Sequence, residues 1–416
     1  MTLMLHSLWN RRAAGMLCVL TIALSVALLL GVERLRGEAR QNFLQTVSGV
    51  DLIVGARSHP VQLLLYSVFH LGEPTQDISW QSYQRIVAHP QVAWAIPFSL
   101  GDSHRGYRVV GTAKDYFQRF RYGQGKELAF QNGQAFSNLL DTVIGAEVAE
   151  RLEYRVGESI IVSHGTVSAM AQHDEHPFRV AGILERTGTP VDRGVYVSLE
   201  AIEAIHQNWR SGTRLPGDGR SEAQLEAERF VPVRITSVMV GLKAKPAVFM
   251  VQRALNTYTA EPLTAIMPGV ALQQLWGLLS MVERALFAAA ACVVAVGLIG
   301  MMSVLLATLN ERRREMALLR AIGATRLDVF GVMLGEAALL VGFGTVLGWL
   351  LLQMALGLAE PMVSSALGVQ LSWQLLPTRV ECGWLGSIWL IACSIACLPA
   401  WLAMRRSVAD GITVRT

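Results

Sequence analysis

Four stretches of the chain are hydrophobic enough and long enough to cross a lipid bilayer as helices. The apolar core of a bilayer, about 30 Å thick, needs about 20 apolar residues in a helix. The first, second and fourth stretches contain no charged residue, and the third contains only Glu336. The predicted spans are residues 13–32, 285–309, 329–358 and 383–404. The first is longer than the apolar part of a cleaved signal peptide, so we interpret it as an uncleaved anchor.

Arginine residues beside the spans predict how the chain is oriented. Two arginines precede the first span, five lie between the second and third, and three follow the fourth, whereas the loop 359–382 offers only Arg379. Positive residues in short flanks favour the cytoplasmic side. We therefore expect segments 1–12, 310–328 and 405–416 to be cytoplasmic.

The region between the first and second spans, residues 33–283, is then extracytoplasmic and long enough for its own core. Its two ends, 33–47 and 270–284, carry apolar residues at helical spacing among charged neighbours. We predict that both continue a span outward as a paired stalk; the alternative is two core-facing helices that end near the membrane. None of the five cysteines lies in the region. It is therefore stabilised without disulfides, which fits a bacterial periplasm.

Between the predicted stalk helices the pattern is mixed α/β. We expect one layered domain from about residues 48–111 and 231–269, with 112–230 inserted into it and a mobile loop at 211–227. The predicted strands are 51–54, 92–98, 107–110, 160–163, 178–184, 195–198 and 233–241, and the predicted helices 79–88, 146–152, 200–209 and 246–258. The fold predicted is four transmembrane α-helices with a large mixed α/β domain between helices 1 and 2.

The amino-acid composition agrees with a membrane protein and argues against binding of nucleic acid and against enzymatic activity. The chain is 52% hydrophobic and 16% charged, against about 25% charged in an average soluble domain. The net charge of +4 is small and its arginines lie near hydrophobic runs, which is not the footprint of a nucleic-acid-binding protein. The sequence contains no phosphate loop, GxSxG or HExxH motif, so we expect neither enzymatic activity nor a cofactor bound by this chain.

The predicted cytoplasmic loop, NERRREMALLRAIGATRLDVF at 310–330, has charges first and then an apolar face of Met316, Leu319 and Ile322. A break follows at Gly323, and Thr325 is the expected N-cap of the next helix. Such a short amphipathic helix could dock into a groove on a cytosolic partner. It could equally lie on the membrane with its arginines against anionic lipid.

The run ERRREMALLRAIGAT resembles the coupling-helix motif of the FtsX, LolC/LolE and MacB permeases of ABC transporters. The order of one span, a large outer domain and three spans is similar to that family, as are TGTPVDRGVYVSLEAI at 187–202 and FRVAGIL before it. The tail PAWLAMRRSVADGI at 399–412 also resembles the family, although Val408 stands where a proline is usual. The resemblance covers essentially the whole chain.

The resemblance implies a bacterial inner-membrane protein whose periplasmic domain has two lobes, called porter and sabre. It implies a second permease copy, and a cytosolic ATPase dimer that carries ATP and Mg. Since the chain begins directly at the first span, we expect that ATPase to be a separate polypeptide. The expected ATPase-contact residues are Glu311, Arg312, Arg313, Arg314, Glu315, Met316, Leu319, Arg320 and Gly323.

The third span contains two pairs of glycines at small-xxx-small spacing, Gly331 with Gly335 and Gly344 with Gly348. Such spacing allows close helix packing, within the bundle or in a dimer, although glycine is also frequent in membrane helices. Glu336 would be costly facing lipid, so we expect it to face protein or water. The alternative is a charge at the membrane interface.

Histidines gather in the predicted outer region. His164, His173, Asp174 and His176 fall on a loop between two strands and could share a zinc-like ion, but their spacing matches no established ligand pattern, and a solvated hairpin is the alternative. The segment 59–70 carries an apolar patch that could line a dimer contact, grip a hydrophobic substrate or form a buried core helix.

The sequence thus predicts a permease subunit that couples ATP hydrolysis by its partner to periplasmic movement. The expected cargo is a lipoprotein or amphipathic molecule, with membrane lipid and a periplasmic protein as further partners. An FtsX-like signalling scaffold that regulates a periplasmic hydrolase, and a metal-linked exporter, are the alternatives.

Overall fold

The computed structural model describes residues 12–46, 48–164, 176–206, 209–210, 213–214, 228, 230–311, 320–321, 323–367 and 376–405. The chain divides into two compact units, considered one at a time. The membrane unit comprises residues 1–38, 280–365 and 370–416. The α/β unit comprises residues 39–279 and 366–369.

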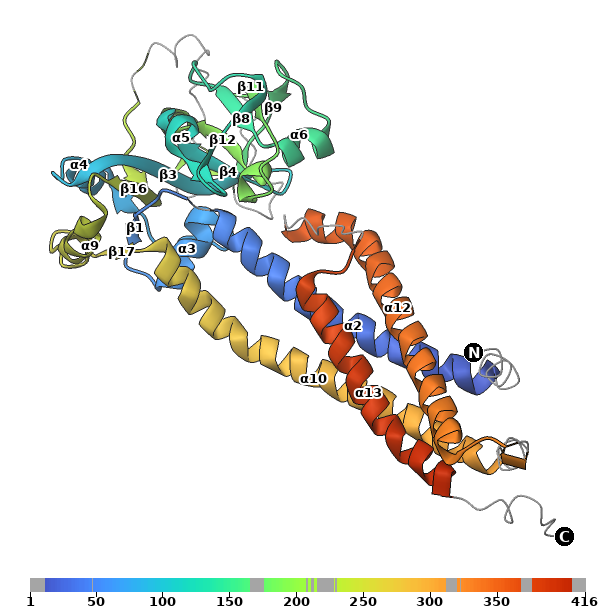
Figure 1. Ribbon diagram of the computed structural model, residues 1–416. Helices are drawn as coiled ribbons and strands as arrows, with labels where there is room; N and C mark the ends of the chain where they lie inside the picture. The colour runs from blue at the N-terminus through green and yellow to red at the C-terminus, as the bar shows by residue number, and fades with distance from the viewer. Residues whose placement is uncertain are drawn as a thin grey trace. The chain divides into compact units, whose positions relative to one another are not determined.

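Four long helices of the described residues provide the membrane spans (Figure 1). They are α2 (Arg12–Thr46), α10 (Pro268–Glu311), α12 (Arg326–Leu367) and α13 (Arg379–Arg405). Their apolar stretches are Gly15–Glu38, Pro268–Ala307, Arg326–Glu360 and Arg379–Leu402. The four predicted transmembrane helices are therefore confirmed. Helices α2 and α10 each contribute residues to both units, and α12 runs past its apolar stretch to Leu367.

The helices of the membrane unit are apolar on all sides, as expected where one face meets protein and the other meets lipid. The inward faces meet in a core that includes Ile22, Val341 and Ala392. On the outward side, Val296 and Leu390 are 66% and 62% exposed. In water these exposed side chains would be unfavourable, whereas a bilayer solvates them.

The α/β unit is built on one 11-stranded mixed sheet of the described residues. Its main path runs β17-β1-β16-β3-β4-β12-β8-β11-β7, with β10 paired to β3 and β9 paired to β11. The strands are β1 (Leu52–Ala56), β3 (Val92–His104), β4 (Tyr107–Thr112), β7 (Phe130–Gly133), β8 (Asp141–Ile144), β9 (Ser159–Ile160), β10 (Ser163–His164), β11 (Phe178–Leu184), β12 (Val195–Ser198), β16 (Ser237–Leu242) and β17 (Leu263–Ile266).

Shorter elements complete the unit. The helices are α3 (Pro60–Val68), α4 (Trp80–Val87), α5 (Asp115–Arg119), α6 (Ala146–Leu152), α7 (Leu199–His206) and α9 (Val248–Asn256), with 3₁₀ turns η1 (Pro190–Arg193) and η2 (Lys245–Ala247). Two-stranded pairs are formed by β2 (Ile78–Ser79) with β15 (Arg234–Ile235), β5 (Arg121–Tyr122) with β6 (Lys126–Glu127), and β13 (Trp209–Arg210) with β14 (Thr213–Arg214). Figure 1 shows α4 and α9 at the β1–β16 end of the sheet and α6 at the β8–β11 end.

Both faces of the sheet are buried because successive residues of a strand point to opposite sides. On β1, Ile53 joins a core with α3 and α5, whereas Leu52 and Val54 join a second core with α4 and α9. On β12, Tyr196 joins the first of these cores and Val195 joins a third core under α6 and α7. One face therefore has a continuous core and the other has two separate ones.

The mixed α/β character predicted from the sequence is confirmed. Strands β11 and β12 and helix α6 have the predicted bounds. The predicted strand 160–163 is instead two short strands, β9 and β10, which pair with different partners. The segments predicted to be the layered domain and its insertion share this one sheet, because β4 pairs in parallel with β12. Apart from β14, the predicted mobile loop 211–227 lies outside the described residues.

Candidate functional site

The segment between α10 and α12 is described only at its two ends. Glu311 is the last residue of α10, and Arg320 and Ala321 are helical. Of the other predicted contact residues, Gly323 is described, while Arg312, Arg313, Arg314, Glu315, Met316 and Leu319 lie outside the described residues.

The predicted break at Gly323 is confirmed. Its φ angle is +104°, a value that favours glycine, and its N–H donates to the carbonyl oxygen of Arg320 at 3.2 Å. A glycine with a left-handed backbone commonly ends a helix in this way. The chain therefore turns sharply here before α12 begins.

Helix α12 begins with a reciprocal cap. The Asp328 N–H donates to Thr325 Oγ1 at 3.2 Å, and the Thr325 N–H donates to Asp328 Oδ2 at 2.7 Å. This confirms Thr325 as the predicted N-cap and places a carboxylate on the positive end of the helix.

The glycines of the third span differ in their surroundings. A Cβ on Gly344 would lie 2.7 Å from Ile22 Cγ2, and a Cβ on Gly348 would lie 2.6 Å from the Ala23 carbonyl oxygen. These two glycines therefore let α12 approach α2 within the bundle. At Gly331 a Cβ would meet no atom within 4 Å, and Gly335 is half-buried.

An ionic cluster lies inside the membrane unit, where charge is costly. Arg34 on α2 contacts Glu38 Oε1 at 3.7 Å and Glu381 Oε1 at 3.6 Å through its Nε. Its Nη1 donates to Gln353 Oε1 on α12 at 3.2 Å. The side chains of Arg34 and Glu381 are each 4% exposed. One arginine thus joins α2, α12 and α13.

Glu381 has a second role at the start of α13. Its Oε2 accepts from the Thr378 N–H at 2.8 Å, and its own N–H donates to Thr378 Oγ1 at 3.2 Å. This is a capping box that fixes the carboxylate on the first turn. The remaining oxygen is therefore held in place toward Arg34. Glu336, elsewhere on α12, is 6% exposed and faces the protein, as predicted.

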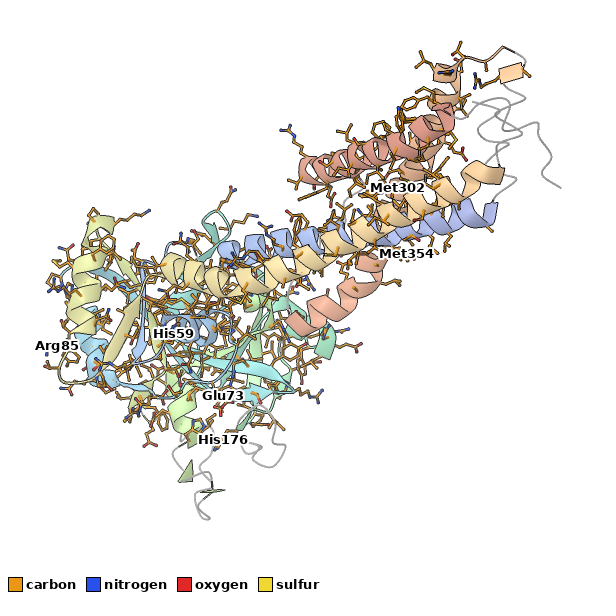
Figure 2. All side chains as sticks on the ribbon, turned by 90° about the horizontal axis from the view of Figure 1, so that it is seen from below. His59, Glu73, Arg85, His176, Met302 and Met354 are labelled. Carbon is orange, nitrogen blue, oxygen red and sulfur yellow. The ribbon has the colours of Figure 1, made fainter. Side chains whose placement is uncertain are left out.

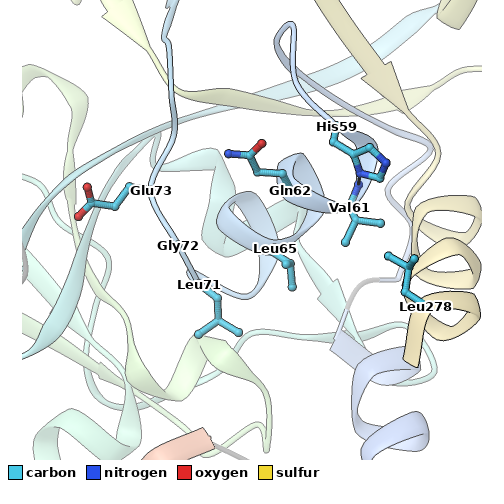
Figure 3. A pocket seen from close by; sticks show the side chains of 8 residues that line it. All are labelled: His59, Val61, Gln62, Leu65, Leu71, Gly72, Glu73 and Leu278. Atoms are coloured by element: carbon cyan, nitrogen blue, oxygen red, sulfur yellow. Dashed lines mark hydrogen bonds between the residues drawn. The ribbon is translucent and has the colours of Figure 1, made fainter. Parts of the chain in front are cut away.

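The α/β unit contains an open recess of about 330 Å³ between α3 and α10. Figure 3 shows Val61 and Leu65 of α3 facing the same space as Leu71 and Leu278. The polar residues of its wall are His59, Gln62 and Glu73. Figure 2 marks His59 and Glu73 on the same unit. The apolar patch predicted at 59–70 is thus a helix whose one side is buried in the core and whose other side lines this recess.

The loop after α3 holds Leu71 between two residues with positive φ angles, His70 at 55° and Gly72 at 77°. The Leu71 N–H donates to the Leu65 carbonyl oxygen at 3.1 Å, and Arg108 Nη2 donates to the Gly72 carbonyl oxygen at 2.6 Å. Burial and the nearby Arg108 guanidinium lower the pKa of His70 to about 4. His70 is therefore neutral at physiological pH.

The predicted metal cluster is only partly described. His173 and Asp174 lie outside the described residues, and His164 is described as part of β10 without its side chain. His176, marked in Figure 2, is half-buried. Within the described part of the chain, no group of three or more His, Cys, Asp or Glu side chains could hold an ion.

Sequence reasoning missed the ionic cluster and the recess. Arg34 and Glu38 are spaced as an i,i+4 pair at the end of the first span, and the Thr378–Glu381 spacing is a capping-box signal. Those signals indicate local contacts, but the approach of Arg34 to Glu381 depends on how the helices pack. The recess likewise brings Leu278 to α3 from a distant part of the chain.

Comparisons with known proteins cover most of the chain. The family model described as MacB-like periplasmic core domain matches residues 16–258, and the model described as FtsX-like permease C-terminal matches residues 287–408. Over 66 residues the chain is 46% identical to the macrolide export ATP-binding/permease protein MacB of Nitrobacter winogradskyi. That stretch covers 16% of this chain and 10% of the relative, so the match spans about a tenth of that protein.

Two solved structures are also similar to the chain. The periplasmic region of MacB from Actinobacillus actinomycetemcomitans aligns with 10% identity and a TM-score of 0.34, over 55% of this chain and 94% of that one. The extracellular domain of the noncanonic ABC-type transporter YknZ from Gram-positive bacteria aligns with 14% identity and a TM-score of 0.29, over 52% of this chain and 99% of that one.

Proposed function

Because the chain belongs to the MacB/FtsX family of ABC transporter permeases, we propose that it transmits work from a cytosolic ABC ATPase to its own periplasmic domain. Two copies of the chain act with a cytosolic ABC ATPase dimer. Binding and hydrolysis of ATP by that partner change the conformation of the periplasmic domain, which moves a lipoprotein or another amphipathic cargo. The chain itself performs no chemistry.

The ATPase contact is assigned to the segment between α10 and α12. The observation that supports this assignment is the sharp turn at Gly323, followed by the capped start of α12 at Thr325. A segment that joins two spans moves with them when a partner pushes on it. The positive-inside pattern supports a cytoplasmic position for this segment and for both termini.

Charge reversal tests the contact. We expect Arg313→Glu and Arg320→Glu to lower co-purification of the ATPase with the affinity-tagged full chain, and the ATP hydrolysis of the isolated complex, by at least about tenfold. Arg379→Glu is the matched control, because Arg379 belongs to the predicted outer side and is exposed. The proposal is wrong if the two reversals leave association and hydrolysis at the level of this control.

Transmission to the periplasm is assigned to α2 and α10. Each is a single helix that contains residues of both units. An uninterrupted helix passes displacement along its axis, because its backbone hydrogen bonds connect every turn to the next. These two helices are therefore covalent routes by which movement in the membrane unit reaches the α/β unit.

Both helices carry an exposed glycine next to the boundary between the units, Gly37 in α2 and Gly277 in α10. A Cβ at either position would meet no atom within 4 Å, so close packing does not require glycine there. Glycine in a helix costs about 0.5–1 kcal/mol relative to alanine. We assign the two glycines to bending of the stalk during the cycle.

The double variant Gly37→Ala/Gly277→Ala tests this assignment. It should retain ATPase association and melt no lower than the wild type, while ATP-driven protease sensitivity of the periplasmic domain falls at least about threefold. Gly331→Ala serves as the control, because Gly331 also has open space but lies away from the boundary. Unchanged ATP-driven sensitivity in the double variant would rule out the bending role.

A further inference from the structure

The recess between α3 and α10 has the chemistry of a site for a flexible alkyl chain. Its apolar wall consists of one valine and three leucines, and its lining contains no Phe, Tyr or Trp ring that would select a flat ligand. Its volume of about 330 Å³ is roughly twice that of an engineered apolar cavity that binds benzene. By that comparison it accommodates about ten to twelve carbon atoms of a chain. His59, Gln62 and Glu73 leave one part of the wall polar.

Two of the apolar wall residues are held in contact with water. Leu71 is 50% exposed and Leu278 is 65% exposed. The left-handed backbone of His70 is uncommon for a residue other than glycine, and the 2.6 Å bond from Arg108 to the Gly72 carbonyl oxygen fixes the same loop. The loop therefore presents Leu71 at the recess instead of burying it. Backbone strain of this kind persists where the surrounding structure imposes it, commonly at binding sites.

An exposed apolar face of α10 continues from the recess. Leu278, Val282 and Leu286 follow one another at intervals of four residues, and they are 65%, 57% and 52% exposed. Met281, which is 73% exposed, lies beside them at i+3 from Leu278. The charge-free part of the second span begins at residue 285, about 10 Å along the helix from Leu278. One helix face thus connects the wall of the recess with a surface that meets lipid.

We propose that the recess binds one acyl chain of a membrane amphiphile, which reaches it from the outer leaflet along this face of α10. The proposal rests on the proposed function, because it assumes that the α/β unit lies outside the membrane and that the cargo is amphipathic. Continuity with the lipid-facing part of α10 favours a membrane lipid over a ligand from solution. Covering Leu71 and Leu278 removes apolar surface from water, which favours binding.

Photo-crosslinking of the full chain tests the proposal. A benzophenone amino acid replaces Leu71 in chains reconstituted into phosphatidylethanolamine and phosphatidylglycerol vesicles, with a trace of phospholipid carrying an alkyne on one acyl chain. We expect at least tenfold more tagged lipid on this chain after irradiation than on a chain with the same photoreactive residue at Phe249. Phe249 is 67% exposed on α9 and does not line the recess.

A second substitution separates the recess from mere closeness to the membrane. With the probe at residue 71, Leu278→Asn should lower lipid labelling at least fivefold, because it makes an apolar wall polar. Leu279→Asn is the matched control and should leave labelling within a factor of two, because Leu279 is 38% exposed on the same helix but does not line the recess. Both positions are partly exposed, so folding should survive; size-exclusion profiles check this.

Several outcomes would overturn the proposal. A crosslinked product of twice the chain mass, in place of a lipid adduct, would show that a second copy fills the recess. Equal labelling at residues 71 and 249 would show that no site exists. Equal labelling by a tagged free fatty acid in detergent solution would show that the ligand does not need the membrane route along α10, and that part of the proposal would be wrong. The assay contains neither ATPase nor nucleotide, so its result is independent of whether Arg313→Glu and Arg320→Glu disturb the ATPase contact.

Discussion

Replacement of Arg34 tests whether the ionic cluster stabilises the membrane unit. Arg34→Met keeps most of the length of the side chain and removes its charge and its donors. The variant leaves the Glu381 side chain, 4% exposed, without its cationic partner on α2. It also leaves Gln353 Oε1 without the 3.2 Å hydrogen bond from Arg34 Nη1.

The expected loss follows from the burial of the pair. Removing one partner of a buried ion pair costs about 3–5 kcal/mol, because the other charge stays buried without compensation. The Thr378 N–H still donates to Glu381 Oε2 at 2.8 Å, so we expect the lower end, about 3 kcal/mol. For a unit of this size, 1 kcal/mol shifts the melting temperature by about 2–4 °C, so the expected shift is about 6–12 °C downward.

A native cysteine provides the assay. Cys18 is 4% exposed in the core of the membrane unit, so a thiol-reactive dye reports the unfolding of that unit on heating in detergent. The other four cysteines are replaced by alanine in every chain compared. Arg34→Met/Glu381→Gln removes both charges and should regain at least half of the lost stability. The reasoning fails if Arg34→Met melts within 2 °C of its parent, or if the double variant loses the sum of the single losses.

Two further variants test packing and electrostatics. Gly348→Ala should lower stability by about 1–3 kcal/mol, because its Cβ would lie 2.6 Å from the Ala23 carbonyl oxygen, whereas Gly331→Ala should be neutral or slightly stabilising; dye-monitored melting distinguishes them. Burial acts to raise the pKa of Glu261, but hydrogen bonds from Ser82 and Ser79 outweigh it and lower the pKa. The contribution of the Glu261 carboxylate to the free energy of unfolding is therefore fully present at neutral pH, and it is lost as the pH falls through the lowered pKa. Glu261→Gln should cost about 1 kcal/mol at pH 7 and progressively less as the pH falls through the lowered pKa, measured by chemical denaturation.

The parts of the fold that the sequence predicts well are those decided by local chemistry. An uncharged run of about 20 apolar residues is long enough to span a bilayer and would be unfavourable if it were exposed to water. The four spans are therefore readily identified. Gly323 and Thr325 act on their nearest neighbours, so the turn and the cap of α12 could be predicted from residue type alone. Strand β12 is equally clear, because four buried residues stand between a turn and a helix.

The parts that could not be predicted depend on pairing between distant segments. Strands β8 and β17 are each four residues long and have no strong pattern of their own. They form because β11 and β1 offer a free edge at the right register. The parallel pairing of β12 with β4, which joins the predicted layered domain and its predicted insertion in one sheet, likewise leaves no mark on the local sequence. The recess and the ionic cluster have the same origin.

Stability alone does not explain why the cluster is ionic. Replacing a buried ion pair with well-packed apolar side chains is often neutral or stabilising, so an apolar bundle would hold together at least as well. The ion pair adds a preferred axial register of the helices. The Arg34 guanidinium contacts Gln353 and Glu381 at the same time only when α2 has one axial position relative to α12 and α13. Helix α2 is one of the helices that contain residues of both units.

The double variant Arg34→Met/Glu381→Gln therefore separates two properties. It should recover much of its melting temperature, and yet it should lose at least about threefold in the coupling between ATP hydrolysis and periplasmic protease sensitivity. A single Glu33→Gln control should leave both properties unchanged, because Glu33 forms an ion pair with the half-exposed Arg36 of its own helix. If coupling in the double variant equals that of the control, the ion pair stabilises the bundle without setting the register through which α2 transmits movement.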